Sequence, residues 1–190
     1  MEPSFKFIRV RDVHVPTRAN AGDAGIDFYV PNDLTKEDLD IANSRNNTYH
    51  NITFTQAKGD NHTTYTLVHI LLPPNSRISI PSGIRGILEP EASMLQANNK
   101  SGISSNGGII FSAEVVDSGY LGEIHLGVIN TGQCVYVIEV GKKLVQFVHV
   151  PIYLSKPEEI MDSEFIELKT KKELESGRGE AGMGSGKETL

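Results

Sequence analysis

The sequence contains one cysteine, Cys134, and no tryptophan among its 190 residues. A single cysteine excludes an intrachain disulfide, and no spacing of cysteine and histidine residues indicates a zinc site. The neighbours of Cys134 in QCVYVIE predict a strand. A core role for the thiol is therefore favoured over a nucleophilic role, for which no base partner is evident.

Long apolar runs and an excess of positive charge are also absent. No apolar segment approaches the ~20 residues that span a bilayer, and the opening segment MEPSFKFIRVRD lacks the basic-then-apolar order of a secretion signal. The formal net charge of −6 argues against general nucleic-acid binding, which requires a basic surface. The length of 190 residues predicts a single domain. The absences predict that this domain has no membrane segment and lies in the cytoplasm, of its own cell or of a host cell.

Short segments rich in valine and isoleucine recur along the chain, separated by proline, glycine, asparagine or aspartate. This pattern is typical of strands joined by turns, so the sequence predicts an all-β fold of the sandwich, jelly-roll or barrel kind. Helix is scarce, and the best candidate is residues 35–44, where Thr35 can cap a turn that contains Asp38. The predicted strands are residues 5–10, 65–72, 77–80, 84–88, 123–129, 134–140 and 143–152.

Two segments do not fit the strand pattern. Residues 32–70 hold half of the asparagines of the chain and few large apolar residues before Tyr65, which predicts a surface insertion. Residues 163–190 alternate charge clusters and then become glycine-rich, a composition too poor in apolar surface to stay ordered alone. They form either a tail without function or a flexible arm whose glycine amides and Arg178 bind phosphate. We therefore expect a β domain over residues 1–162, with the insertion at about 32–70, followed by this C-terminal arm.

The segment AEVVDSGYLGE, residues 113–123, places an acidic residue and a tyrosine three positions apart between two predicted strands. A hairpin of this kind can offer backbone groups to a planar ligand, a ring to cover it and a carboxylate to activate water. Asp-Ser-Gly is also an ordinary turn sequence, so the spacing alone leaves both interpretations open.

Five segments, read in order, resemble the five motifs of the trimeric deoxyuridine triphosphatase (dUTPase) family. AGDAGIDFYVP is similar to the family's Ala-Gly-x-Asp element, and NKSGISSNGG to its Arg-Ser-Gly-Leu phosphate loop. The hairpin is in register with the third motif. GKKLVQFVHVPI resembles the Gly-Glu-Arg-Ile-Ala-Gln strand, and RGEAGMGSG the closing Arg-Gly-x-Gly-Gly-Phe-Gly-Ser arm. The resemblance covers residues 1–31, 71–152 and the tail, and it leaves residues 32–70 unexplained.

The resemblance implies a jelly-roll-like subunit that assembles as a homotrimer, with active sites where chains meet and a flexible C-terminal arm. The implied activity is Mg²⁺-dependent hydrolysis of dUTP to dUMP and pyrophosphate, which limits uracil incorporation into DNA and supplies dUMP. This reaction needs water delivered in line at the α-phosphorus while the negative charge of the phosphates is neutralised.

Each matched position takes a role in that reaction by resemblance. Asp117 would be the general base, Tyr120 would pack under the deoxyribose and exclude a 2′-hydroxyl, and the backbone around Ala113 would pair with the uracil edge. Asp27 and Gln146 would hold metal-bound water, because Mg²⁺ prefers phosphate oxygens and retained waters to an all-protein cage. Gln146 is also expected to bind the substrate. The other expected substrate-binding residues are Lys100, Ser101 and Gly102 and, in the arm, Arg178, Met183, Gly184 and Ser185.

Several positions of the matched segments depart from the family pattern. Lys100 replaces an arginine and loses its bidentate fork, Glu114 stands where glycine is common, and Met183 replaces the phenylalanine of the arm. None of the six histidines falls in a motif, and the alternation around His125 and His149 favours structural roles for both.

Two alternative functions stay open. A dCTP deaminase-type enzyme shares the fold and parts of the hairpin, although Tyr120 and the Lys-Ser-Gly loop fit the triphosphatase better. A dUTPase-like regulatory protein would use residues 32–70 to bind a protein partner.

Overall fold

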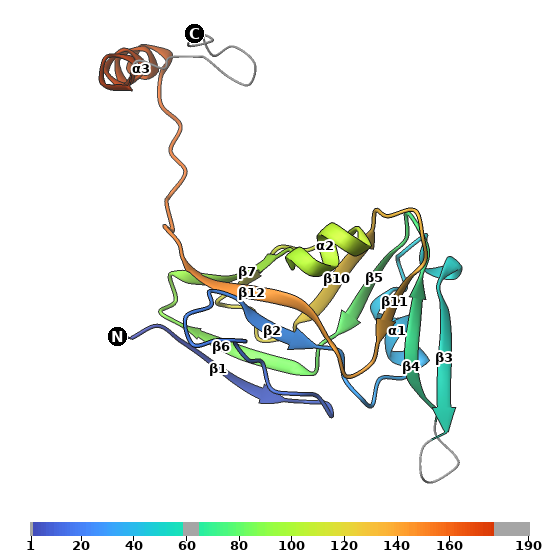
Figure 1. Ribbon diagram of the computed structural model, residues 1–190. Coiled ribbons are helices and arrows are strands. Elements are labelled where there is room, and N and C mark those ends of the chain that lie inside the picture. Colours follow the sequence, from blue (N-terminus) through green and yellow to red (C-terminus); the bar gives the residue numbers. More distant parts are fainter. Residues whose placement is uncertain (1, 59–64, 177–190) are drawn as a thin grey trace. The chain divides into compact units, whose positions relative to one another are not determined.

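The computed structural model describes residues 2–58 and 65–176 (Figure 1). The chain forms two compact units, Met1–Tyr153 and Leu154–Leu190. Within the described part, the first unit is built mainly of strands, which are β1 Ser4–Arg9, β2 Ile26–Tyr29, β3 Thr53–Lys58, β4 Tyr65–Leu72, β5 Arg77–Pro81, β6 Ile84–Glu89, β7 Ser93–Asn98, β8 Ile109–Phe111, β9 Val115–Asp117, β10 His125–Asn130, β11 Tyr136–Glu139 and β12 Lys143–Pro151. Its short helices are α1 Lys36–Ala42, η1 Tyr49–Asn51 and α2 Ser101–Gly107. The predicted all-β class is confirmed.

The strands pair in antiparallel fashion throughout, in sheets of order β1-β6, β5-β10-β8, β11-β4-β3 and β2-β12-β7-β9. Side chains on successive positions of a strand point to opposite faces, so each sheet turns one face to the common core. In β10, Leu126 and Val128 are fully buried in this way, and in β7 Leu95 and Ala97 are buried. Burial of each leucine or isoleucine of this core stabilises the fold by about 1.5–3 kcal/mol.

All seven predicted strands are present, but five further strands were not predicted. β7, with the sequence SMLQAN, has one partly exposed face that carries Gln96 and Asn98, and β3, with TFTQAK, is exposed at every position except the partly buried Phe54, so polar residues hide both strands in the sequence. β2, β8 and β9 have only three or four residues each, too few for a period to be recognised. The core role predicted for Cys134 is wrong. It is exposed and precedes β11, in a turn where Asn130 Nδ2 donates to the Cys134 carbonyl at 2.8 Å.

Helix α1 begins as predicted. The Thr35 hydroxyl accepts from the backbone N–H of Asp38, and the Asp38 carboxylate accepts from the backbone N–H of Thr35, which completes a capping box. Segment 32–70 is nevertheless more than the surface excursion that was expected. Leu34, Leu39 and Ile52 lie in the core, where their apolar side chains fill space beside the sheets.

Segment 32–70 also covers the outer edge of β5. The Asn43 side chain donates to the Ser79 carbonyl and accepts from the Ser79 N–H, both at 2.9 Å. Two strand positions earlier, Asn46 donates to the Arg77 carbonyl at 2.6 Å, and the Arg77 N–H donates to Thr48 Oγ1 at 3.2 Å. These side chains pair with backbone groups that an exposed edge strand leaves unsatisfied. The asparagines that suggest a loop in the sequence therefore close a sheet edge.

In the second unit, helix α3 spans Asp162–Ser176, a segment that was expected to lack regular structure. Its sequence, DSEFIELKTKKELES, consists largely of good helix formers, and Asp162 and Glu164 in the first turn favour helix initiation. Phe165, Ile166 and Leu174 remain exposed, so local propensity rather than burial accounts for the helix. In the part of the chain described by the structure, no helix is both long and apolar enough to cross a membrane.

Candidate functional site

Asp27 is the centre of a charged cluster. It lies on β2 with 5% of its surface exposed, and its two carboxylate oxygens accept from Lys100 Nζ at 2.6 Å and Lys143 Nζ at 3.1 Å. Two cationic partners compensate for the cost of burying this carboxylate. On the neighbouring strand β12, Gln146 lies directly opposite Asp27. The fold thus brings together three of the sequence motifs, which are far apart in the chain.

Lys143 was not predicted as a site residue. Its hydrogen bond to Asp27 and the attraction of that carboxylate raise the pKa of the Lys143 ammonium above its ordinary value. Lys143 stands three residues before Gln146 in GKKLVQ, where the side chains of a strand alternate between its faces. Only the pairing of β12 with β2, together with the local register shift between Lys143 and Val145, shows that Lys143 reaches Asp27.

The phosphate-loop candidates lie at the beginning of α2. Lys100 is the N-cap, and Ser101 and Gly102 form the exposed first turn. A Cβ atom on Gly102 would have no neighbour within 4 Å, so this surface is open to a ligand or to solvent. Gly108 ends the helix in the left-handed conformation with φ of 66°, which glycine adopts without strain.

Gln146 is held close to the glycine of the first motif. A Cβ atom on Gly25 would lie 2.8 Å from Gln146 Oε1, so a larger residue at this position would displace the amide. Gln146 Nε2 donates to the Asn99 carbonyl at 3.4 Å, next to Lys100. This packing explains the glycine that precedes Asp27 by two positions.

The hairpin candidates form a second group. The Tyr120 N–H donates to the Asp117 carbonyl at 3.0 Å, which closes the turn after β9, and the Tyr120 hydroxyl donates to the Glu123 carbonyl at 2.9 Å. Both Asp117 and Tyr120 are exposed. Ala113 precedes β9 and is also exposed. It lies next to Gly127, where the Ser112 hydroxyl leaves no room for a Cβ atom. A carboxylate, an aromatic ring and free backbone groups are therefore all available to a ligand on this hairpin.

The two groups lie apart within one chain. Along β7, Asn98 is opposite Gln146 and Met94 is opposite Asp117, which separates the groups by ~13 Å along the strand direction. Asp117 on β9 is also three strand positions from Asp27 in the order β2-β12-β7-β9, or ~14 Å across the sheet. Figure 1 shows β2 and β12 beside β7 in this layer. One chain presents two half-sites about 20 Å apart, by these spacings.

The remaining residues of interest lie elsewhere. The rings of His125 and His149 each contact a serine hydroxyl, Ser79 at 3.0 Å and Ser93 at 2.8 Å, and burial lowers the pKa of both histidines. These contacts agree with structural roles. The arm candidates lie outside the described residues; they are Arg178, Met183, Gly184 and Ser185.

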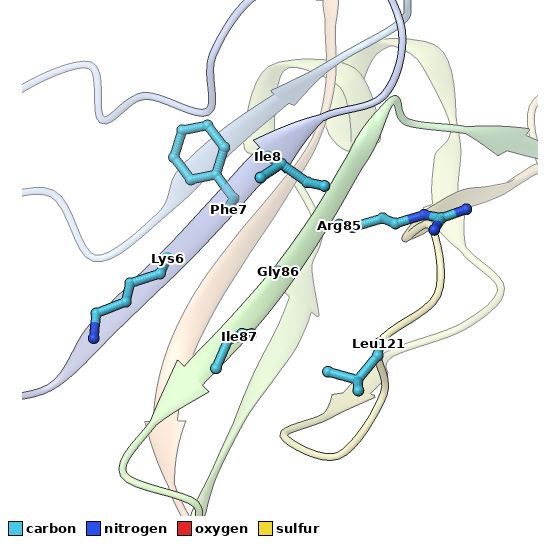
Figure 2. A pocket seen from close by; sticks show the side chains of 7 residues that line it. All are labelled: Lys6, Phe7, Ile8, Arg85, Gly86, Ile87 and Leu121. Atoms are coloured by element: carbon cyan, nitrogen blue, oxygen red, sulfur yellow. The ribbon is translucent and has the colours of Figure 1, made fainter.

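Figure 2 shows a shallow pocket on the outer face of β1 and β6, next to the hairpin. Ile8, Ile87 and Leu121 are more than half exposed there. None of the predicted site residues lines this pocket, so it is not the expected nucleotide site. Its lining residues are Lys6, Phe7, Ile8, Arg85, Gly86, Ile87 and Leu121.

Comparison of the sequence with known proteins identifies related enzymes. A family model described as dUTPase matches residues 64–185. The deoxyuridine 5'-triphosphate nucleotidohydrolase of Clostridium kluyveri is 34% identical over 123 residues, which cover 64% of this chain and 78% of the relative. The enzyme of the same name from Fusobacterium nucleatum is 36% identical over 118 residues, which cover 60% of this chain and 73% of the relative.

Solved structures agree in fold. A mutant dUTPase of Staphylococcus bacteriophage 80alpha with dUpNHpp matches with a TM-score of 0.63 and 17% identity, over 96% of this chain and 97% of that chain. A mutant dUTPase of phage phi11 of S. aureus, described with a structural Mg(II) ion, matches with a TM-score of 0.60 and 16% identity, over 84% of this chain and 97% of that chain. The sequence matches and the shared fold agree, and the chain belongs to the dUTPase family.

Proposed function

We propose that this protein hydrolyses dUTP to dUMP and pyrophosphate, and so limits uracil incorporation into DNA while supplying dUMP. The observation that carries the proposal is the convergence of Asp27, Lys100 and Gln146, from three separate motifs, in a chain whose Asp117–Tyr120 turn is also intact. Membership of the dUTPase family supports the same activity, since the relatives are named for it.

The hairpin supplies the groups that select and attack the substrate. Asp117 is exposed at the end of β9, where its carboxylate can accept a proton from the attacking water. Tyr120 packs under the deoxyribose and disfavours a 2′-hydroxyl, while backbone groups near Ala113 read the uracil edge and reject cytosine, whose donor and acceptor are reversed.

The lysine cluster supplies positive charge for the triphosphate. Ser101 is exposed at the start of α2, and Lys100 lies next to it with its Nζ paired to Asp27, so both side chains can donate to phosphate oxygens. In the arm, Arg178, Gly184 and Ser185 complete the phosphate contacts, and Met183 covers the base.

The donor set fits a magnesium ion that is held mainly by the substrate. Among the described residues, no group of three or more histidine, cysteine, aspartate or glutamate side chains could form a protein cage. Mg²⁺ usually retains waters and phosphate ligands, and the Asp27 carboxylate and the Gln146 amide have acceptor capacity left for metal-bound water. When bound, Mg²⁺ would neutralise charge on the triphosphate.

We further propose that the active protein is a homotrimer whose sites combine the two half-sites of different chains. The separation of Asp117 from Asp27 within one chain supports this assembly. The exposed apolar residues of the pocket in Figure 2 also favour an interface at that face. A protein partner at residues 32–70 and a cytoplasmic location stay predictions.

The direct test is incubation with each deoxynucleoside triphosphate and with UTP in the presence of Mg²⁺, with pyrophosphate measured as product. We expect release from dUTP only, together with dUMP. Ammonia release from dCTP with retention of the triphosphate would instead indicate the deaminase. Absence of any turnover of dUTP would contradict the proposed function.

A further inference from the structure

Glu123 lies three residues after Tyr120 and connects the turn to the body of the β unit. Its backbone carbonyl accepts the Tyr120 hydroxyl at 2.9 Å. Its carboxylate accepts from Arg11 Nε at 2.8 Å and from the Gly83 backbone N–H at 2.7 Å. The position of the Tyr120 ring therefore depends on where Glu123 is held.

Arg11 joins Glu123 to helix α1. Its Nε donates to Glu123, and its Nη1 donates to Asp38 Oδ1 at 2.9 Å. The three side chains are only 21%, 15% and 23% exposed for Arg11, Glu123 and Asp38, so solvent screens their interaction weakly. A guanidinium carries its donors in a rigid fork and can hold two carboxylates in fixed relative positions, which a single ammonium group cannot do as well.

Asp38 is itself fixed by the beginning of α1. Its Oδ2 accepts from the backbone N–H of Thr35 at 2.9 Å and from the Thr35 hydroxyl at 2.6 Å, while Oδ1 accepts from Arg11. Burial favours the neutral form of Asp38, but the bonds from Thr35 and Arg11 outweigh it and hold the pKa below its ordinary value. Burial likewise disfavours the charged form of Arg11, yet its bonds to Glu123 and Asp38 raise its pKa.

These contacts form one continuous path from segment 32–70 to the candidate catalytic turn. We propose that Arg11 and Asp38 are positioning residues for the turn that carries Asp117 and Tyr120, so that segment 32–70 sets the sugar selectivity and the turnover of the enzyme. This inference rests on the proposed function for its kinetic consequences. The geometric part, that the network fixes the turn, holds independently of any substrate.

The geometric part is tested without nucleotide. Hydrogen–deuterium exchange of peptides covering residues 113–123 is compared in the full-length parent, Arg11→Ala and Asp38→Asn. Exchange in both variants should be faster by about tenfold, because loss of a charge-assisted bond makes local opening easier. Asp40→Asn is the matched control, since Asp40 lies on the same helix and pairs with Lys36 and Tyr49 instead. Parental exchange of these peptides in Arg11→Ala would overturn the inference, whatever the enzyme does.

The functional part uses steady-state kinetics with dUTP and UTP on the same proteins, at a temperature where circular dichroism shows all of them folded. In Arg11→Ala, the ratio of kcat/KM for dUTP to that for UTP should fall at least about tenfold, since small misplacements of a positioned group cost up to ~100-fold. Arg11→Lys should recover part of this ratio, because it keeps the charge but not the fork. An unchanged ratio in Arg11→Ala, with an active parent, would overturn the inference alone. A parent protein that is inactive on dUTP would overturn the proposed function. The exchange experiment would then still test whether the network fixes the position of the turn.

Discussion

Asp27 and Asp117 differ in exposure, and this difference separates the roles proposed for them. Asp27 is almost fully buried, and each of its oxygens accepts a hydrogen bond from a lysine. A carboxylate in this setting organises the cations around it. Asp117 is exposed on a turn and is available to water. Of the two, only Asp117 is placed to accept a proton from an attacking nucleophile.

Replacement of Asp117 by asparagine should therefore remove most turnover of dUTP and leave nucleotide binding largely intact. Loss of a general base typically lowers the rate by ~100- to 10,000-fold, while the amide keeps the size of the side chain. The measurements are pyrophosphate release and the Kd of a non-hydrolysable dUTP analogue. Ser118→Ala, in the same turn, serves as the control. A fully active Asp117→Asn enzyme would remove this residue from the mechanism.

The sequence predicts which residues belong to the site better than it predicts which of them are in contact. Asp27, Lys100 and Gln146 were assigned from motif resemblance, and the structure places them together. Lys143 could not be assigned in the same way, because its contact with Asp27 arises where the β12 register shifts between Lys143 and Val145. A strand period carries no information about such an irregularity.

At the scale of elements, helix α1 shows what a local signal can establish. The Thr35 and Asp38 pair was recognised from sequence because a capping box needs only residues three apart. The role of Asn43, Asn46 and Thr48 was not recognised, because their partners lie on β5, more than 25 residues further along the chain. Composition alone described this segment as a loop.

The cap predicts a specific dependence of stability on pH. Asp38 has a depressed pKa in the folded protein, so the stability it contributes is present above the ordinary aspartate pKa of about 3.9 and is lost as the pH falls towards the folded value. Asp38→Asn should lower the Tm at pH 7 by about 2–4 °C, for a loss of ~1 kcal/mol. This difference should shrink as the pH falls below about 4.

Thermal unfolding followed by circular dichroism at pH 7 and at about pH 3.5 checks this expectation. Glu37→Gln, in the same turn of α1 but exposed, should change the Tm at pH 7 much less. A difference between parent and Asp38→Asn that is the same at both pH values would show that the cap acts through shape rather than charge.

We expect that the C-terminal segment can be removed without loss of the fold of the β unit. The match to the closing motif of the family falls after helix α3, and the charged, exposed surface of that helix supplies little of the core. If the arm excludes water and completes the phosphate contacts as proposed, deletion of residues 176–190 should leave a folded protein of parental Tm with turnover of dUTP reduced by at least about 100-fold. Kinetics and thermal unfolding of the truncated chain are the measurements. Undiminished activity would refute a catalytic role for the arm.

At the scale of the whole molecule, the protein shares its fold with dUTPases whose sequence identity to it is too low to have revealed that fold. The phage dUTPases match at 16–17% identity with TM-scores of 0.60–0.63. Many alternative apolar residues can satisfy a buried strand position, so strand order and register persist after individual residues change. The family was nevertheless predicted correctly, because five segments resemble its motifs and follow one another in the family's order.

Assembly is the level that a single sequence specifies least directly. Within one chain, the half-site with Asp27 lies about 20 Å from the half-site with Asp117, as calculated from the rise along a strand and the distance between strands. No rearrangement of a turn closes such a distance across a hydrogen-bonded sheet. If both groups act on one substrate, they must come from different copies of the chain.

Complementation between two inactive variants tests this arrangement. Asp27→Asn and Asp117→Asn are each expected to be nearly inactive alone. When the two proteins are co-expressed or unfolded and refolded together in equal amounts, roughly a quarter of the sites should combine a native Asp27 from one chain with a native Asp117 from another, by random assembly. Activity should therefore return to about that fraction of the parental value. Mixing either variant with itself is the control, and light scattering establishes that each variant forms trimers. If mixed assemblies form and stay inactive, both groups act within one chain, and the proposed sharing of sites is wrong.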